Sequence, residues 1–184
     1  MLTFALLSLA VLIANLLTAG WTNTKFFSVY RSPLTDILTY PRFFLHVLGH
    51  LNYQHYIGNM LLLLVIGPPL EEKYGSRNMI FAFVITAFVC GLVQWAFFPG
   101  SSLLGASGLV FMMIVLSSLS GMRKASIPIT LIFVLIFYIG KEIIDGLFTS
   151  DNISQLTHII GGACGAVIGL LIFRKSGRKK TSKS

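Results

Sequence analysis

The sequence has few charged residues. Asp, Glu, Lys and Arg make up 11% of its 184 residues, and only six residues are acidic. A soluble globular domain carries about 25% charged residues, so this composition excludes an ordinary water-soluble domain. The chain is 55% hydrophobic, and several stretches of about 18 residues or more are nearly free of charge, long enough to cross a bilayer. These features predict an all-α polytopic membrane protein.

Cysteine is also scarce. Cys90 and Cys164 both fall inside apolar stretches, where cysteine is typical of a small packing residue. Two such cysteines indicate neither a disulfide framework nor a cysteine metal site.

Basic residues outnumber acidic ones, which gives a net charge of +8. Six of the basic residues lie within residues 174–184, directly after an apolar run. This clustering is typical of a cytoplasmic anchor near anionic lipid headgroups, not of a face that binds nucleic acid. We therefore expect a basic cytoplasmic tail at 174–184 and no nucleic-acid partner.

Six apolar runs predict six transmembrane helices in a membrane domain that spans residues 1–173. The runs cover about residues 2–19, 54–70, 79–98, 107–122, 127–141 and 156–173. The second helix is expected to end at Pro68-Pro69, because proline disrupts helix interiors. The segment at about 20–51 is rich in aromatic residues and poor in charge, so it is predicted to lie at the membrane interface.

The distribution of Lys and Arg predicts the orientation. If the C-terminus is cytoplasmic, ten basic residues lie inside: the six of the tail, Lys73, Arg77, Arg123 and Lys124. Only four lie outside: Lys25, Arg31, Arg42 and Lys141. This bias places both termini in the cytoplasm. The second, fourth and sixth helices then begin at the outer face.

The turn Gly105-Ala106-Ser107-Gly108 lies at the start of the fourth apolar run, and Ser107 is the candidate nucleophile. A serine between small residues at the first turn of a helix has an exposed hydroxyl beside free backbone N–H groups, where an oxyanion can form. Small residues at this spacing are also common packing surfaces in membrane helices, and serine often caps a helix. The tetrapeptide alone is compatible with both interpretations.

Four polar residues favour the catalytic interpretation, because all fall at the predicted outer ends of helices. They are His55, Asn59, Ser107 and His158, and His158 is expected in the first turn of the sixth helix. Such convergence indicates a shared hydrated cavity. His158 is the best candidate base, because the glycines that follow it every four residues allow close approach to the fourth helix. Its alternative role is that of a polar residue satisfied at a helix start.

These motifs together resemble the rhomboid family of intramembrane serine proteases. The resemblance covers most of residues 40–173. It rests on His50, His55 and Asn59 in an H-x4-H-x3-N pattern, Glu71 after the second helix, Gly105-x-Ser107-Gly108, and His158 followed by Gly161 and Gly165. It implies hydrolysis of peptide bonds in or near transmembrane segments of membrane-protein substrates. It further implies a multi-pass protein of the plasma or inner membrane, whose active site opens to the extracytoplasmic side.

The resemblance also implies roles for individual residues. Ser107 and His158 form a catalytic dyad, and the Ser107 backbone N–H with the side chains of His55 and Asn59 forms the oxyanion site. Further residues are carried over as supporting (His50, Gly105, Phe111) or structural (Arg42, Glu71, Gly161, Gly165). The sequence departs from the family where many members carry Trp at Pro41 and Tyr at Phe111. The proposed chemistry requires no cofactor and no metal.

Several alternatives compete with this interpretation. One is a catalytically silent relative that binds transmembrane helices, although Ser107 and His158 are both present. A second is a haem- or metal-binding membrane protein that uses His46, His50 and His55, but their spacing suits one metal face poorly. A transporter would need membrane-depth acids and paired broken helices. Neither Asp145 nor Asp151 is spaced to orient His158 as a third triad member.

The fifth predicted helix, at about 127–141, is short and has few polar anchors. We expect substrate to reach the site laterally from the lipid, past this helix.

Overall fold

The computed structural model describes residues 1–120 and 152–181, and the chain is largely helical within these ranges. The long helices are α1 (Leu2–Leu17), α4 (Tyr53–Tyr74), α5 (Ser76–Phe97), α6 (Ser107–Ser120) and α8 (Asn152–Thr181). They coincide with five of the six predicted apolar runs. The fifth run, at about 127–141, lies outside the described residues, and so does the predicted lateral entry past it.

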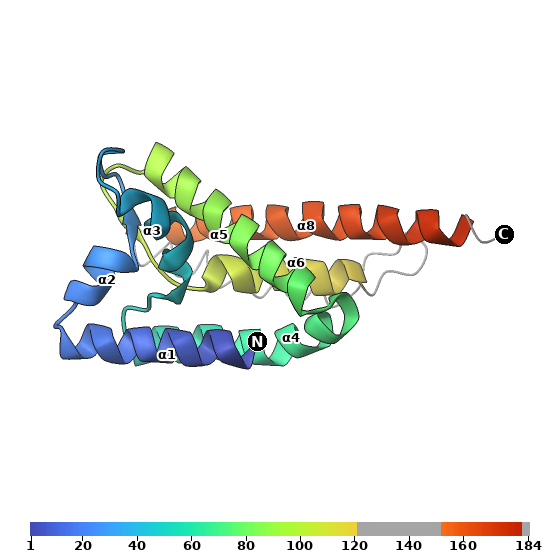
Figure 1. Cartoon of the computed structure of the whole chain (residues 1–184), viewed down its shortest axis with the longest axis horizontal. Coiled ribbons are helices and arrows are strands. Elements are labelled where there is room, and N and C mark those ends of the chain that lie inside the picture. The colour runs from blue at the N-terminus through green and yellow to red at the C-terminus, as the bar shows by residue number, and fades with distance from the viewer. Residues whose placement is uncertain (121–151, 182–184) are drawn as a thin grey trace.

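Helix α6 occupies the centre of the helical assembly. It packs against α8, α4 and α5, while α1 packs against α4. In Figure 1, α1 and α4 run side by side, α6 lies between this pair and α8, and α5 crosses the others obliquely. The main apolar core lies between α1, α4, α5 and α6 and includes Leu12, Leu63, Met79 and Met112, all at most 2% exposed. The candidate nucleophile therefore begins the most enclosed of the long helices.

Glycines bring α8 into backbone contact with α6. A Cβ atom at Gly161 would collide with the carbonyl oxygen of Gly108, and one at Gly165 would collide with that of Met112. From the first contact to the second, the residue number rises by four in both helices, so α6 and α8 run parallel and in register. Only glycine allows this approach. The contact fixes His158 of α8 relative to the start of α6.

One described helix, α5, is long and apolar enough to cross a membrane. Its 22 residues span about 33 Å at 1.5 Å per residue, which matches a hydrocarbon core of about 30 Å. Shorter apolar helices cover Leu2–Leu17, Ser107–Leu119 and Thr157–Leu171.

Three predicted helix limits were wrong. Helix α4 does not end at Pro68-Pro69 but continues to Tyr74. The φ angle of proline suits a helix, so each proline removes one backbone hydrogen bond without ending the helix, and membrane helices tolerate such losses. The last helix begins at Asn152 and not near residue 156, and it continues through most of the basic segment to Thr181.

The predicted interfacial segment is folded back on the helices by short elements. These are α2 (Trp21–Phe26), β1 (Val29–Tyr30), α3 (Thr39–Leu45) and the 3-10 helix η1 (His46–Leu48). Strand β1 pairs antiparallel with β2 (Ser102–Leu103), which matches Val29 with Leu103. The stretch before Ser107 thus contains a short strand that attaches it to the interfacial segment.

Arg42 holds this segment together from inside. Its side chain is 2% exposed and donates to the Lys25 carbonyl (Nε–O 3.0 Å) and to Asp36 (Nη1–Oδ2 3.0 Å). Its guanidinium also lies 4.7 Å from the ring centre of Tyr30. The Leu38 backbone N–H and this guanidinium hold the pKa of Asp36 below its ordinary value.

Candidate active site

Ser107 is the first residue of α6 and is half-buried. The preceding carbonyl, that of Ala106, accepts the first helical hydrogen bond from the Val110 N–H (3.0 Å). Gly105 has a φ of +122°, which favours glycine, and its N–H donates to the His46 carbonyl (2.9 Å). The turn is therefore held at a fixed position, and the N–H groups of the first turn of α6 have no partner within the helix.

His158 lies in the second turn of α8, not the predicted first turn, because the helix begins at Asn152. Its ring stacks on Phe111, with ring centres 4.3 Å apart and planes 10° from parallel. Phe111 is four residues after Ser107, so the two side chains share a face of α6. The stacking and the Gly161–Gly108 contact together place the imidazole beside the first turn of α6.

His55 and Asn59 lie on one face of α4, close to its N-terminus. The Asn52 side chain caps this helix by accepting from the His55 N–H (2.9 Å). A Cβ atom at Gly105 would lie 2.8 Å from His55 Nε2 and 3.9 Å from Asn59 Nδ2. The two side chains therefore converge on the backbone just before Ser107.

A hydrogen bond fixes the amide of Asn59. One N–H of Nδ2 donates to the His55 carbonyl (3.0 Å), and an amide nitrogen carries two such donors. The second N–H can still be directed at an oxygen bound near Gly105.

His50 contacts His55. It is fully buried, its Nδ1–H donates to the Leu48 carbonyl (3.1 Å), and its ring centre lies 5.1 Å from that of His55. Glu71 lies at the opposite end of α4, where it accepts from the Met1 amine (2.8 Å). Arg42, also predicted to be structural, anchors the interfacial segment as described above.

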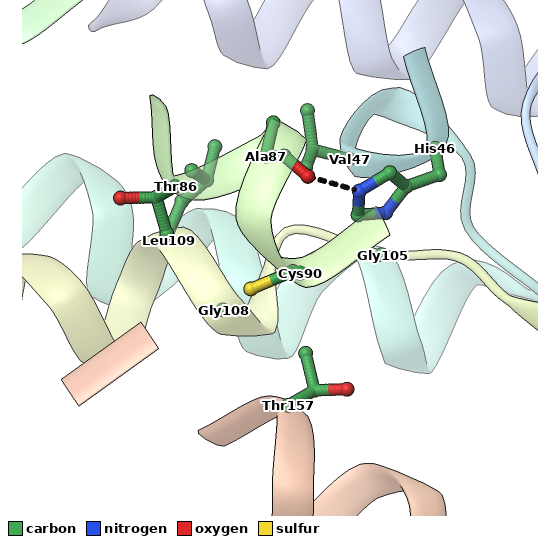
Figure 2. A pocket seen from close by; sticks show the side chains of 9 residues that line it. All are labelled: His46, Val47, Thr86, Ala87, Cys90, Gly105, Gly108, Leu109 and Thr157. Carbon is green, nitrogen blue, oxygen red and sulfur yellow. Dashed lines mark hydrogen bonds between the residues drawn. The ribbon is translucent and has the colours of Figure 1, made fainter. Parts of the chain in front are cut away.

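A narrow space, too small to hold a water molecule, lies behind the serine turn. It is lined by Gly105 and Gly108 and by side chains of η1, α5, α6 and α8 (Figure 2). In this view His46 Nε2–H donates a hydrogen bond to the Ala87 carbonyl (3.0 Å). Within residues 1–120 and 152–181, no group of three His, Cys, Asp or Glu residues could hold a metal ion.

Sequence reasoning missed two polar residues next to the site. Asn15 of α1 and Asn23 of α2 are both buried, and Asn23 contacts the backbone of His50. The signal that could have identified Asn15 is its amide inside an otherwise apolar run, because polar groups in membrane helices need a partner. No comparable signal marks Asn23, which lies in a mixed segment.

Comparison with known proteins identifies the family of the chain. The family model described as the Rhomboid domain matches residues 38–175. Similar proteins include Rhomboid-related protein 1 of Caenorhabditis elegans (29% identical over 140 residues, 71% of this chain and 39% of the relative). Rhomboid-related protein 2 of Mus musculus is 29% identical over 144 residues, 72% of this chain and 48% of the relative. The chain thus spans less than half the length of either relative. The family match covers well over half of this chain and confirms the predicted resemblance: the chain is a membrane protein that belongs to the rhomboid family.

Proposed function

We propose that the protein is an intramembrane serine endopeptidase that cleaves peptide bonds in or near transmembrane segments of other membrane proteins. The rhomboid family includes intramembrane serine proteases. The observation that carries the proposal is the parallel contact of α6 and α8. In this contact Gly161 packs on Gly108 and the His158 ring stacks on Phe111, which supports a pairing of His158 with Ser107.

The dyad acts by nucleophilic catalysis. His158 accepts the proton of the Ser107 hydroxyl as Oγ attacks the carbonyl carbon of the scissile bond. The same imidazole then protonates the leaving amine, which departs and leaves an acyl-enzyme. Water attacks this ester with His158 as base, which releases the second product and restores the serine. Every proton is carried by the imidazole, so the reaction needs no cofactor.

The oxyanion of each tetrahedral intermediate lies between three donors. The Ser107 backbone N–H is free of helical partners because it belongs to the first turn of α6. His55 Nε2 and Asn59 Nδ2 approach the same turn from α4. Preorganised donors of this kind contribute about 10²–10³ in rate each. Gly105 is required between them, because a side chain there would occupy the space of the His55 ring.

The substrate backbone must unwind before it reaches the serine, because helical carbonyls are already hydrogen-bonded. We therefore expect cleavage near small or helix-breaking residues. The proposal keeps the six-helix topology with both termini in the cytoplasm. It also keeps a site that opens to the extracytoplasmic side of the plasma or inner membrane, where the ends of α4, α6 and α8 that carry the polar residues would lie.

Covalent labelling tests the proposal. The detergent-purified full chain, Ser107→Ala and His158→Ala are each treated with a fluorophosphonate probe, after thermal unfolding has established that all three are folded. We expect the intact chain to be labelled at Ser107 and both variants to lose labelling. An intact, folded chain that takes up no probe would favour the catalytically silent alternative instead.

A further inference from the structure

Two buried asparagines connect the first helix of the chain to the candidate oxyanion site. Asn15 lies in the last turn of α1, and Asn23 lies in α2. Asn15 is 6% exposed and Asn23 is 4% exposed. Buried amides are costly unless hydrogen-bonded. The hydrogen-bond partners of the two asparagines therefore indicate which parts of the chain they fix.

Asn15 fixes the position of Asn23. Its Oδ1 accepts from the backbone N–H of Asn23 at 3.1 Å. This N–H belongs to the first turn of α2, where backbone donors have no partner within the helix. The Asn15 side chain thereby attaches the short helix α2 to α1.

Asn23 in turn fixes the backbone of His50. Its Nδ2 donates to the His50 carbonyl at 2.9 Å. The chain is pressed closely against α2 at this point, because a Cβ atom at Gly49 would lie 3.3 Å from Asn23 Oδ1 and would collide with the Phe27 carbonyl oxygen. Gly49 and His50 therefore have little room to shift.

His50, whose backbone is fixed in this way, packs directly against His55. The two rings pack edge to face with centres 5.1 Å apart. The ring of Tyr56 also packs edge to face against the His50 ring, with centres 5.5 Å apart. Tyr56 is itself held, since its hydroxyl donates to the Ala5 carbonyl of α1 (3.1 Å). His55 is enclosed between this support and Gly105.

We propose that Asn23, held by Asn15, is a positioning residue that sets the location of His55 through His50. The proposal rests on the oxyanion role proposed above for His55. The Rhomboid domain match begins at residue 38. The proposal therefore gives the segment before that residue a role in positioning His55. The contact between α1 and α2 thus takes part in the geometry of the site.

The test uses the same Asn-to-Asp change at three positions of the full chain in detergent. Asn23→Asp keeps the shape of the side chain but replaces the N–H donor to the His50 carbonyl with an oxygen. Asn15→Asp keeps the Oδ1 acceptor. Asn78→Asp removes an exposed hydrogen bond of the same kind, in which Asn78 Nδ2 donates to the Tyr74 carbonyl (2.7 Å), far along the chain from the site.

The rate of fluorophosphonate labelling is the first readout, because the phosphonyl oxygen of the probe occupies the oxyanion site. We expect Asn23→Asp to slow labelling by about tenfold or more, since misplacement by about 1 Å can cost about 10²-fold in rate. Asn15→Asp and Asn78→Asp should retain the rate, whereas Asn15→Leu, which removes the acceptor, should slow it. In a His55→Ala background, Asn23→Asp should cause little additional loss. Full additivity of the two losses would contradict the positioning role.

A second readout does not depend on activity. The chain has four histidines, so the ring nitrogens can be followed by NMR of protein labelled with ¹⁵N-histidine. Asn23→Asp should shift the His50 and His55 signals and leave those of His46 in place, while Asn78→Asp should shift none. Unchanged His50 and His55 signals would overturn the proposal even if Ser107 reacts normally. Shifted signals in a chain that takes up no probe would support the contact while the proposed protease function fails.

Discussion

At the scale of single residues, the site depends on rings and donors that other side chains keep in place. The imidazole of His158 stacks on Phe111. A phenylalanine contributes stacking but no hydroxyl, so the orientation of the imidazole depends on packing and not on a phenolic hydrogen bond. The residue at 111 should therefore affect the reactivity of the dyad through the orientation of His158.

Substitution at Phe111 tests this dependence. Phe111→Tyr keeps the stacked ring and adds a donor, so we expect labelling of Ser107 by the fluorophosphonate probe to be as fast as in the intact chain or faster. Phe111→Ala removes the stacking partner and should slow labelling by about tenfold or more. Truncation of a buried phenylalanine also costs about 3–5 kcal/mol of stability, so labelling rates are compared below the unfolding temperature of each variant. Equal rates for Phe111→Ala and the intact chain would show that the stacking is not needed.

At the scale of secondary-structure elements, the contact between α6 and α8 determines whether serine and histidine meet. Gly161 and Gly165 face the backbone of α6 without room for a methyl group. Gly162 lies next to Gly161 but differs in its surroundings, because a Cβ atom there would meet only Val115 Cγ2, at 3.5 Å. The chain thus contains its own matched pair for testing the contact.

We expect Gly161→Ala to separate α6 from α8 and Gly162→Ala to leave them in place. Overpacking of this kind costs about 1–3 kcal/mol, so thermal unfolding in detergent should occur at a lower temperature for Gly161→Ala. Probe labelling of Ser107 should fall with it, because the imidazole moves away from the hydroxyl. Gly162→Ala should match the intact chain in both measurements. Because Gly→Ala by itself favours a helix, the same loss in both variants would show that the close contact at Gly161 is not the cause.

At the scale of the whole molecule, the proposed topology places α2 and the start of α5 on opposite sides of the membrane. Single cysteines test this placement in a chain whose Cys90 and Cys164 are replaced by alanine. Thr24→Cys and Arg77→Cys both introduce exposed thiols. In intact cells, an impermeant maleimide should label Thr24→Cys, and it should label Arg77→Cys only after the membrane is permeabilised. Labelling of Arg77→Cys without permeabilisation would reverse the orientation.

Much of the architecture follows from the sequence. The apolar runs predict α1, α4, α5, α6 and α8, because a helix satisfies its own backbone hydrogen bonds and so suits a long run with little charge. The limits of the helices were less predictable. Helix α4 extends past Pro68 and Pro69 to Tyr74 although prolines usually end a helix, and the pairing of β1 with β2 joins segments more than 70 residues apart.

The sequence by itself determined which residue types are present at the proposed site, because Ser107, His158, His55 and Asn59 occur in a recognisable order and spacing. Only the tertiary structure decided how they are held. The stacking of His158 on Phe111, the enclosure of His55 by Gly105 and His50, and the hydrogen bonds of Asn15 and Asn23 all join different elements of the chain. Periodicity and spacing describe one element at a time, whereas these contacts depend on how closely separate helices approach one another.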